Sequence, residues 1–544
     1  METRLGTVES ARLSVPGSAR QLAATPKPPV AAPLPWYAKN SQMAQTRPLP
    51  RICIALGFPE LDRLMDHARR EAEAGESFLE FRLDYLEHPE RGAQAIHGFV
   101  EQYPDCIVLA TCRRHQNRGK FNGSIEEEMR VLDVAVTAGA QAVDVEIESA
   151  EAAAAKLSLF RGRARLIVSY HNYEATPQLD TLLSRMTHIP ADGYKIVTTA
   201  RKPSDYGRVL TLAKAHPRTP LVVLAMGELG FPSRVLSAAF GGMYTYAAPT
   251  ATQGTAAGQV CARQLRHLYR VDKLSRSSKI YGVVADPVRH SISPAVHNRA
   301  FQYRRMEAVY LPFLVAPAQM RDFFGLAERL PVAGFSVTIP HKQKILRYLD
   351  IVDPLARRIG AVNTVWRKAG KWRGTNTDAA GVTVPLANQM RLHNASVLIV
   401  GNGGAARSAA CALSDAGARI ALVGRNADRV RSLAKICGAE PLLAEQLPER
   451  YFDALVHATP LGMYPHVNEC FFNGRIPADV VFDMVYNPLE TELTRRAREQ
   501  GKTVIRGMQM FIEQAVRQFE TWTGQPAPRS QMEKAALEAL SCIT

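Results

Sequence analysis

The stretch that decides how the first half of the chain folds is Gly193-Tyr194-Lys195-Ile196-Val197-Thr198-Thr199, a short strand with one lysine among apolar and uncharged neighbours. Burial disfavours the ammonium form of a lysine, and the neutral amine is a nucleophile for carbonyl groups. A lysine in a strand can equally extend to the surface or pair with an acid. Its surroundings favour a catalytic role, because nearby runs end in a possible base, His171, and in two cations that suit an acidic substrate, Arg82 and Arg113.

Seven further β-rich runs repeat around this stretch. They cover residues 51–58, 78–86, 106–113, 142–147, 165–171, 220–226 and 243–248. Segments of helical composition, such as 61–74 and 125–138, lie between most of them. Eight strands that alternate with helices over about 220 residues are typical of a (β/α)8 barrel. An open doubly wound sheet is the alternative, but it rarely needs eight repeats.

Polar residues gather where these strands should end, which is where such a barrel places its active site. Alternation puts Glu80 and Arg82 on one face of their strand. The other polar residues lie on or after the third, fifth, sixth, seventh and eighth strands: Arg113, His171, Lys195, Arg234, Thr255 and Gln259. A single arginine at a strand end is usually a surface charge, whereas this convergence predicts a binding site.

Residues 51–262 resemble the type I 3-dehydroquinate dehydratases. The resemblance rests on FLEFRLDYL (78–86), TCR (111–113), SYHNYEATP (169–177), GYKIVTTA (193–200), MGELGFPSR (226–234) and GTAAGQ (254–259). It implies that Lys195 forms a Schiff base with the substrate ketone, that His171 removes and returns a proton, and that Glu80 orients His171. It also implies a set of residues that bind the carboxylate and hydroxyls: Arg82, Arg113, Arg234, Thr255 and Gln259. The chain departs from the family at Asn117, where an acid is common, and this weakens one implied substrate contact and spares the catalytic pair.

The implied chemistry needs these residue types. An iminium draws electrons and so acidifies the neighbouring C–H bond, while an imidazole acts as base and acid near neutral pH. The paired N–H groups of an arginine fit a carboxylate.

Composition excludes several classes of protein. The chain has 544 residues, enough for at least two domains, and 46% are apolar and 22% charged, as in ordinary globular proteins. No run of eighteen apolar residues predicts a membrane span. The eight cysteines form no CxxC pair, which argues against zinc ribbons and disulfide scaffolds. The formal net charge of +16 is spread along the chain, so we predict small anionic substrates rather than nucleic acid.

A second pattern begins after a polar segment at 271–278. A strand at 280–284 leads to Ser291 and Ser293, which flank one residue and could hold a carboxylate; a serine-rich turn that caps a helix is the alternative. Farther on, Lys342 in FSVTIPHK (335–342) and Asp378 in GTNTD (374–378) form the charged pair that we expect to act. A lysine partnered by an aspartate can relay a proton during hydride transfer, although two such charges could also lie on the surface.

A glycine-rich loop predicts a dinucleotide site. The β-run at 396–400 continues into GNGGAAR (401–407) and an alanine-rich helix. Glycines let a pyrophosphate approach the backbone closely, and the helix N-terminus favours its negative charge. The next strand, at 419–423, is followed by Arg425 where an NAD site would place an acid, which indicates the 2′-phosphate of NADP. Asp428 is expected to start the following helix.

Nearly all of residues 279–544 resemble the shikimate dehydrogenases, through the segments above and GAVNT (360–364), ATPLGM (458–463), DMVYNP (483–488) and GMQM (507–510). The resemblance implies that Lys342 and Asp378 are the catalytic pair. It implies that substrate is bound by Ser291, Ser293, Thr338, Asn363, Asp378 and Gln514. It implies that the cofactor is bound by Gly401, Gly403, Gly404, Ala405 and Arg425, with Met463, Val485 and Gly507 on the nicotinamide side. His457 and Gly424 are slight departures, because each stands where the family usually has Asn.

Together these patterns predict an α/β fold, a (β/α)8 barrel followed by a two-domain dehydrogenase with a Rossmann-type NADP-binding domain. We expect a flexible extension at 1–50, the barrel at 51–270 and a linker at 271–278. The next unit is a substrate-binding domain at 279–390, which C-terminal helices within 510–544 complete. The NADP-binding domain lies between them at 391–509. The order of the two halves resembles the bifunctional 3-dehydroquinate dehydratase/shikimate dehydrogenases of aromatic amino-acid biosynthesis.

That resemblance implies dehydration of 3-dehydroquinate to 3-dehydroshikimate, then reduction to shikimate with NADP(H) as cofactor and no metal. It implies that the binding partners are small carboxylates, and that the protein binds neither nucleic acid nor a membrane. We expect a cytoplasmic protein. Plastid import is the alternative, because residues 1–50 are rich in Ala, Pro and Ser and poor in acids, a composition that suits a transit peptide as well as a flexible extension. The competing hypothesis is a quinate-preferring dehydrogenase fused to a ligand-sensing barrel. A sensor should have lost its nucleophile or base, yet Lys195, His171 and Glu80 are all present.

Overall fold

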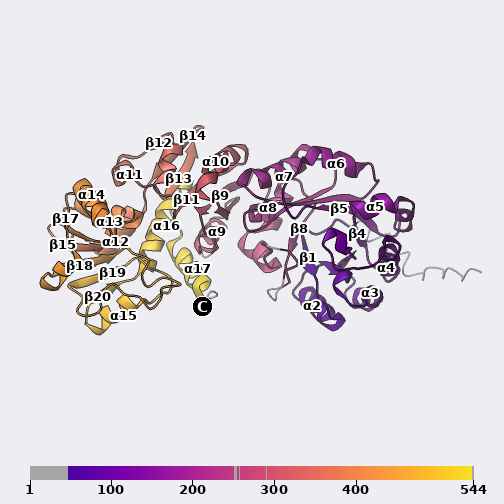
Figure 1. Ribbon diagram of the computed structural model, residues 1–544, viewed down its shortest axis with the longest axis horizontal. Helices are drawn as coiled ribbons and strands as arrows, with labels where there is room; N and C mark the ends of the chain where they lie inside the picture. Colours follow the sequence, from indigo (N-terminus) through magenta and orange to yellow (C-terminus); the bar gives the residue numbers. More distant parts are fainter. Residues whose placement is uncertain (1–46, 250–253, 257, 290, 542–544) are drawn as a thin grey trace, which may run out of the picture.

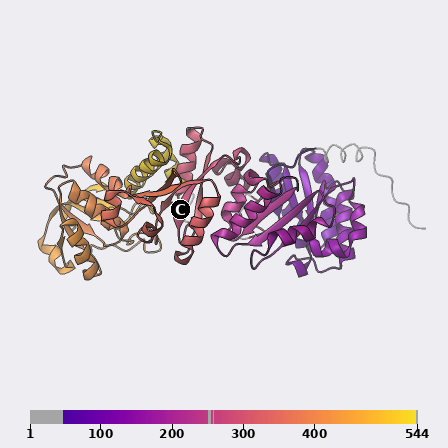
Figure 2. The same ribbon diagram turned by 90° about the horizontal axis from the view of Figure 1, so that it is seen from above.

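The computed structural model describes residues 47–249, 254–256, 258–289 and 291–541. A barrel lies at one end of an elongated molecule, a mixed sheet in the middle and a parallel sheet at the other end (Figures 1 and 2). The expected extension at 1–50 lies almost wholly outside the described residues. Within the described part of the chain, no helix is long and apolar enough to cross a membrane.

The first half is an eight-stranded parallel barrel, as predicted. The strands follow the order β7-β6-β5-β4-β3-β2-β1-β8, and the Met243 N–H donates to Leu221 O, which brings the two ends of the sheet together. Helices cover the outside and side chains fill the inside, so the strands are buried on both faces and are largely apolar. The strands are β1 (Ile52–Leu56), β2 (Phe78–Arg82), β3 (Ile107–Thr111), β4 (Ala142–Glu146), β5 (Arg165–His171), β6 (Gly193–Thr199), β7 (Leu221–Met226) and β8 (Thr245–Ala247). The helices are α2 (Leu61–Glu73), α3 (Pro89–Gln102), α4 (Ile125–Thr137), α5 (Ile147–Ala152), α6 (Leu179–Thr187), α7 (Pro203–Ala215) and α8 (Phe231–Leu236).

The middle unit is a six-stranded mixed sheet in the order β10-β9-β11-β13-β14-β12. The first three strands in this order pair in parallel, while β13 pairs antiparallel with β11 and β14. Its strands are β9 (Lys279–Ala285), β10 (Ala308–Leu314), β11 (Val332–Val337), β12 (Ile351–Val352), β13 (Thr364–Lys368) and β14 (Lys371–Thr375). Its helices are α9 (Ser293–Tyr303), α10 (Met320–Arg329), α11 (Pro354–Ile359) and α12 (Asp378–Ala387).

The last unit is a parallel sheet with the strand order of a Rossmann fold. The order is β17-β16-β15-β18-β19-β20, which runs 3-2-1-4-5-6 along the chain and changes direction between β15 and β18. Its strands are β15 (Ser396–Val400), β16 (Arg419–Val423), β17 (Glu440–Pro441), β18 (Phe452–His457), β19 (Ala478–Asp483) and β20 (Thr503–Ile505). The helices between them are α13 (Gly404–Asp415), α14 (Ala427–Cys437) and α15 (Glu492–Glu499).

The chain then returns to the middle unit. Helices α16 (Gly507–Thr523) and α17 (Arg529–Ser541) share an apolar cluster with α9 and β9, to which Phe519 and Met532 contribute. Trp522 Nε1 donates to Val365 O of β13 at 3.0 Å. The C-terminal helices therefore pack on the mixed sheet, although the parallel sheet precedes them in sequence.

The segment expected to be a linker is packed rather than free. Val271 and Leu274 are buried in the cluster that also contains the barrel helices, and Arg51 Nη1 donates to Leu274 O at 2.9 Å. The same cluster continues into β9 to β11 of the middle sheet. The barrel and the dehydrogenase half therefore share one continuous apolar contact.

Candidate active sites

Lys195 lies inside the barrel in contact with two carboxylates, not in the purely apolar surroundings that its own strand suggests. Its Nζ forms an ion pair with Asp144, lies 3.8 Å from Glu80 Oε1, and donates to Tyr246 Oη at 3.1 Å. Only 2% of Lys195 is exposed. Burial alone would raise the pKa of the Asp144 carboxyl, but the positive charges of Lys195 and then Arg113 outweigh it and hold that pKa below its ordinary value.

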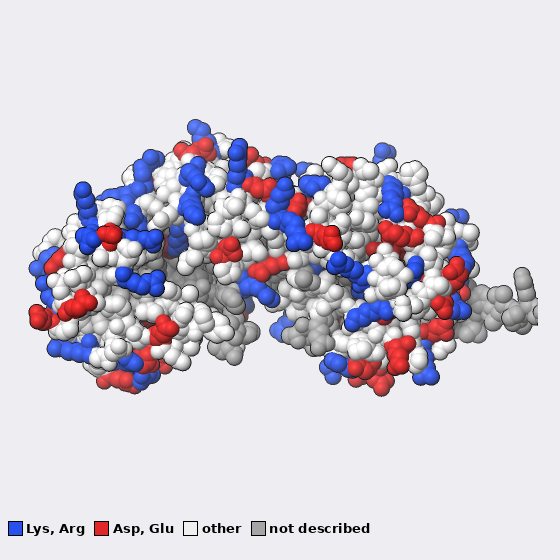
Figure 3. Space-filling view, viewed as in Figure 1, with Lys and Arg blue, Asp and Glu red and all other residues white. Residues whose placement is uncertain are grey.

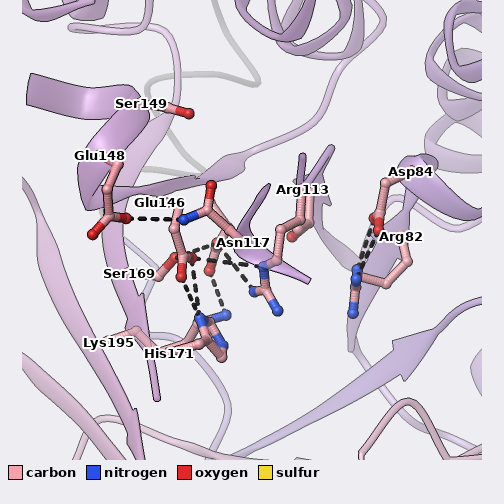
Figure 4. A network of polar contacts seen from close by, with 12 residues as sticks. Arg82, Asp84, Arg113, Asn117, Glu146, Glu148, Ser149, Ser169, His171 and Lys195 are labelled. Atoms are coloured by element: carbon pink, nitrogen blue, oxygen red, sulfur yellow. Dashed lines mark hydrogen bonds and ion pairs between the residues drawn. The ribbon is translucent and has the colours of Figure 1, made fainter. Parts of the chain in front are cut away.

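His171 lies beside Lys195 at the C-terminal end of β5 and is held by Glu146 (Figure 4). Its Nδ1 is 2.9 Å from Glu146 Oε1 and 3.0 Å from Oε2. Burial, followed by the positive charges of Arg113 and Lys195, lowers the pKa of His171 well below its ordinary value. A neutral imidazole whose Nδ1 is fixed can offer Nε2 to a substrate as a base.

The expectation that Glu80 orients His171 is wrong. The Glu80 carboxylate accepts from Thr111 Oγ1 at 2.7 Å and faces Lys195 instead. The physical reason is barrel order: β3 and β4 separate β2 from β5, whereas β4, which carries Glu146, pairs directly with β5.

The three predicted arginines are buried but differ in their partners. Arg113 lies 3.7 Å from Asp144 and 3.6 Å from Glu146, within the cluster around His171. Arg82 makes two hydrogen bonds to Asp84, at 2.8 and 2.7 Å, and stands apart from that cluster (Figure 4). Burial lowers the pKa of Arg234 to about 10, which still leaves its guanidinium charged at neutral pH.

The segment after β8 brings Thr255 and Gln259 together. Gln259 Oε1 accepts from the Thr255 N–H at 2.8 Å, and the two side chains also lie within hydrogen-bond distance of each other. Asn117 lies at the mouth of the barrel, where its Nδ2 donates to Glu148 Oε2 at 3.0 Å. A cavity of about 210 Å³ lies there, and its lining includes Asn117, Glu148 and His171.

Three polar groups of the barrel site were not predicted: Asp144, Glu146 and Tyr246. The signal for the first two is present in the sequence, because Asp144 and Glu146 alternate within the run 142–147 and so face the same side of a barrel strand. Ser169 Oγ bonds to both carboxylates, at 2.7 and 2.6 Å. Tyr246 lies among apolar and tyrosine neighbours on β8 and has no such signal.

The second site joins three segments that are separate in sequence. Lys342 Nζ donates to Asp378 Oδ2 at 2.5 Å, and Asn363 Nδ2 donates to the other oxygen, Oδ1, at 2.7 Å. Asp378 begins α12, where the helix dipole favours its negative charge. The structure thus brings together Lys342, Asp378 and Asn363, as the motifs predict.

The predicted substrate-binding serines lie at the start of α9. The Ser293 N–H donates to Ser291 Oγ at 3.3 Å, and the Ser293 side chain bonds to the Tyr310 hydroxyl. Thr338 is half-buried just beyond β11. Gln514 lies on the face of α16 that packs against α12, and its Nε2 donates to Phe511 O at 2.9 Å.

The loop between β15 and α13 has the shape that a dinucleotide requires. Gly401 has φ +130, and a Cβ there would lie 2.8 Å from Ala458 O, so only glycine fits. Gly403 and Gly404 place the N-terminus of α13 at the end of β15, with Ala405 in the first turn of the helix. A Cβ on Gly404 would lie 3.6 Å from Lys342 Cδ, so this loop borders the lysine–aspartate pair.

The remaining cofactor predictions concern Arg425 and the nicotinamide side. Arg425 is exposed after β16, and Asp428 lies in the first turn of α14, where it pairs with Arg431. Gly507 packs against Val485, because a Cβ on the glycine would lie 2.3 Å from Val485 O. Met463 is exposed in the loop after β18.

Figure 3 shows basic side chains interspersed with acidic ones on the visible face. Among the described residues, no group of three His, Cys, Asp or Glu side chains is placed to hold a metal ion.

Family models match four parts of the chain. The type I 3-dehydroquinase model matches residues 52–276. The shikimate dehydrogenase substrate binding domain matches 283–365, shikimate/quinate 5-dehydrogenase matches 385–459, and the shikimate 5′-dehydrogenase C-terminal domain matches 507–537.

Curated proteins match both the whole chain and its second half. The chloroplastic bifunctional 3-dehydroquinate dehydratase/shikimate dehydrogenase of Arabidopsis thaliana is 33% identical over 505 residues, 88% of this chain and 83% of that protein. The shikimate biosynthesis protein AroDE of Chlamydia pneumoniae is 32% identical over 382 residues, 70% of this chain and 78% of that protein. The shikimate dehydrogenase (NADP(+)) of Thermosynechococcus vestitus is 39% identical over 281 residues, 49% of this chain and 98% of that protein.

Proposed function

Because the chain belongs to the family of bifunctional 3-dehydroquinate dehydratase/shikimate dehydrogenases, we propose that the barrel site and the Lys342 site perform the two activities in turn. The protein dehydrates 3-dehydroquinate to 3-dehydroshikimate and reduces that product to shikimate with NADPH. One observation supports the assignment of residues most directly: Lys195 and His171 lie side by side, each held by its own carboxylate. Both substrates are carboxylates, which suits a chain of net charge +16.

In the barrel, Lys195 acts as the nucleophile. Asp144 touches its ammonium group and is placed to accept the proton that the amine must lose. The amine nitrogen bonds to the ketone carbon of 3-dehydroquinate, and the ketone oxygen leaves as water to give an iminium. Arg113, Arg234 and Arg82 supply the positive charge that favours a carboxylate substrate.

His171 then moves the proton. Its Nε2 takes the proton from the carbon next to the iminium, because Nδ1 is held by Glu146. The electron pair forms an enamine, and the hydroxyl on the next carbon leaves as water with the proton that His171 returns. Water finally hydrolyses the iminium, which releases 3-dehydroshikimate and frees Lys195.

In the second site, Lys342 donates a proton to the carbonyl oxygen of 3-dehydroshikimate. Asp378 holds the ammonium group, and Asn363 holds the other oxygen of that carboxylate. NADPH, when bound, supplies the hydride. The residues that would hold it are Gly401, Gly403, Gly404 and Ala405, with Arg425 toward the 2′-phosphate. A Cβ on Gly404 would lie 3.6 Å from Lys342 Cδ, and this closeness supports a cofactor loop beside the proposed proton donor.

The test is product formation from 3-dehydroquinate and NADPH by the native chain, Lys195→Ala and Lys342→Ala. We expect Lys195→Ala to lose dehydration but still oxidise shikimate with NADP, and Lys342→Ala to lose only the redox step. Both native rates should survive treatment with EDTA, because we propose that neither site uses a metal ion. Failure of the native chain to catalyse either reaction would refute the proposal.

Borohydride trapping separates this function from the ligand-sensing alternative. Reduction in the presence of 3-dehydroquinate should add the substrate skeleton covalently to Lys195, whereas a sensor should remain unlabelled. The ratio of kcat/KM for shikimate and quinate tests the quinate-preferring alternative in the same preparation. A cytoplasmic location stays a prediction, and fractionation of the source cells with an antibody to this chain would test it.

A further inference from the structure

A buried chain of hydrogen bonds borders the second site and is centred on His457 at the C-terminal end of β18. Its Nδ1 is 2.9 Å from Asp483 Oδ1 on the neighbouring strand β19, and its Nε2 is 2.6 Å from Thr459 Oγ1. Asp483 Oδ2 accepts from Thr491 Oγ1 at 2.5 Å. His457 is 1% exposed and Asp483 is wholly buried. Polar groups this deep need complete pairing, so their arrangement is a specific one.

The network lies where the Rossmann sheet changes direction. His457 pairs with Val400 of β15 on one side and with Asp483 of β19 on the other. Ligands of such sheets bind at the C-terminal ends of the strands around this point. Val400 is followed directly by Gly401 of the dinucleotide loop. The network therefore lies next to the residue from which that loop begins.

Thr459 joins the network to the dinucleotide loop. A Cβ built on Gly401 would lie 3.5 Å from the methyl carbon Cγ2 of Thr459. The same Cβ would lie 2.8 Å from the carbonyl oxygen of Ala458. Thr459 Oγ1 also accepts from the Leu461 N–H at 3.2 Å. The hydroxyl of Thr459 thus holds the turn at 458–461 in the position that Gly401 packs against.

The protons of the network can be assigned from its donors. The Asp483 carboxylate already accepts from Thr491 and from the Val485 N–H, at 3.0 Å, so His457 Nδ1 must be the donor to it. Thr459 Oγ1 accepts from the Leu461 N–H, so its own proton is available to His457 Nε2, 2.6 Å away. The carboxylate fixes the tautomer of the histidine, and the histidine in turn fixes the hydroxyl.

We propose that His457 is a positioning residue of the dinucleotide site, which acts through Thr459 on the turn that supports Gly401. This inference rests on the proposed function, because it takes the loop at Gly401 to bind NADP(H). Asp483 adds a second link, since its carboxylate also holds the backbone of Val485, against which Gly507 packs. One buried pair thereby orders the loops after three neighbouring strands of the sheet.

The test compares two substitutions in the full chain by titration with NADP⁺ and with shikimate. His457→Leu removes both hydrogen bonds, and we expect NADP⁺ affinity to fall about tenfold while shikimate affinity changes less than about twofold. His457→Gln can keep both bonds, with its amide N–H toward Asp483 and its amide oxygen toward Thr459. We therefore expect the Gln variant to retain NADP⁺ affinity within about threefold.

Two controls distinguish positioning from a general loss of structure. His466→Gln removes an exposed histidine that makes a 2.8 Å contact with Glu469 in the same unit, and it should leave NADP⁺ affinity unchanged. Thr459→Val should weaken NADP⁺ binding by itself. Adding His457→Leu to it should cause little further loss, because both substitutions remove the same hydrogen bond, the one between His457 and Thr459.

The proposal is overturned by native NADP⁺ affinity in His457→Leu, by an equal fall in NADP⁺ and shikimate affinity, or by additive effects with Thr459→Val. If His457→Leu does not fold, Thr459→Val decides alone: native NADP⁺ affinity in that variant, or an equal fall in its NADP⁺ and shikimate affinity, overturns the proposal. Absence of NADP⁺ binding by the native chain would instead refute the proposed function itself.

Discussion

At the scale of single residues, the barrel site depends on which carboxylate touches which nitrogen. Glu146 holds His171 Nδ1, while Asp144 and Glu80 surround the amine of Lys195. The proposed base and the proposed nucleophile therefore have separate negative partners inside one buried cluster. Each partner can be removed with a predicted effect on one step.

Glu146→Gln should slow dehydration. The amide can still touch His171, but it cannot balance the charge of the imidazolium formed when His171 takes a proton, so we expect kcat to fall about a hundredfold. Borohydride trapping at Lys195 should persist, because the nucleophile is intact. Glu148→Gln is the matched control: it removes an exposed carboxylate two residues away and should reduce kcat far less. Equal losses in the two variants would show that Glu146 has no special role.

The pH dependence of dehydration should reflect the lowered pKa of His171. A base works only when unprotonated, so the rate falls as the pH drops through the pKa of the base. Since burial and the charges of Arg113 and Lys195 lower that pKa, we expect kcat/KM to stay level to a pH well below the ordinary pKa of histidine, about 6.5. A profile that already falls near pH 7 would contradict the assignment of His171 as the base.

At the scale of elements, the short loop between β15 and α13, the proposed cofactor loop, lies beside Lys342, the proposed proton donor. It is bounded on one side by Ala458 and on the other by Lys342. Its backbone geometry therefore matters more than its side chains.

Gly401→Ala should weaken NADP(H) binding at least about tenfold. The φ of +130 strains any other residue, and the new Cβ would press on Ala458 O at 2.8 Å. Gly438→Ala provides the control, because Gly438 also has positive φ, +65, at the end of α14 but has open space around it. The control should cost about 1 kcal/mol of stability and leave the KM for NADPH unchanged. Similar KM values in the two variants would argue against a role for the loop.

At the scale of the whole molecule, the dehydrogenase half completes a helix of the barrel. Asp322 of α10 accepts from the Ser204 N–H in the first turn of α7 at 2.6 Å, and α7 follows the strand that carries Lys195. Nearby, Gly207 of α7 leaves room for Leu326 of α10, since a Cβ there would lie 2.2 Å from Leu326 Cδ1. A helix end of the first enzyme is thus capped by a side chain of the second.

Asp322→Ala should therefore destabilise the barrel by about 1 kcal/mol, the usual cost of losing a helix cap. Heat inactivation of the dehydratase activity should begin at a lower temperature, while shikimate oxidation at ambient temperature stays unchanged. Glu328→Ala removes the same charge from an exposed position of α10 and should have little effect. Identical inactivation curves for the two variants would contradict the capping role.

Most of the fold could be predicted because its signals are local in the sequence. A few consecutive residues are enough to predict each of three features: the eight β-rich runs, the glycine loop after 396–400 and the position of Arg425. The packing of 271–278 could not be predicted in this way, because its polar composition says nothing of the apolar surface that Val271 and Leu274 meet. The return of α16 and α17 to the mixed sheet follows only from the resemblance, not from their own residues.

The sequence by itself determined which residue types reach the two sites: Lys195 and His171 in the barrel, and Lys342 and Asp378 in the dehydrogenase half. Only the tertiary structure decided their partners. Glu146 rather than Glu80 holds His171, because closure of the barrel makes β4 the neighbour of β5 and leaves β2 three positions away. Alternation along a strand shows which side chains face inward, but the neighbours of a strand are set by how the whole sheet closes.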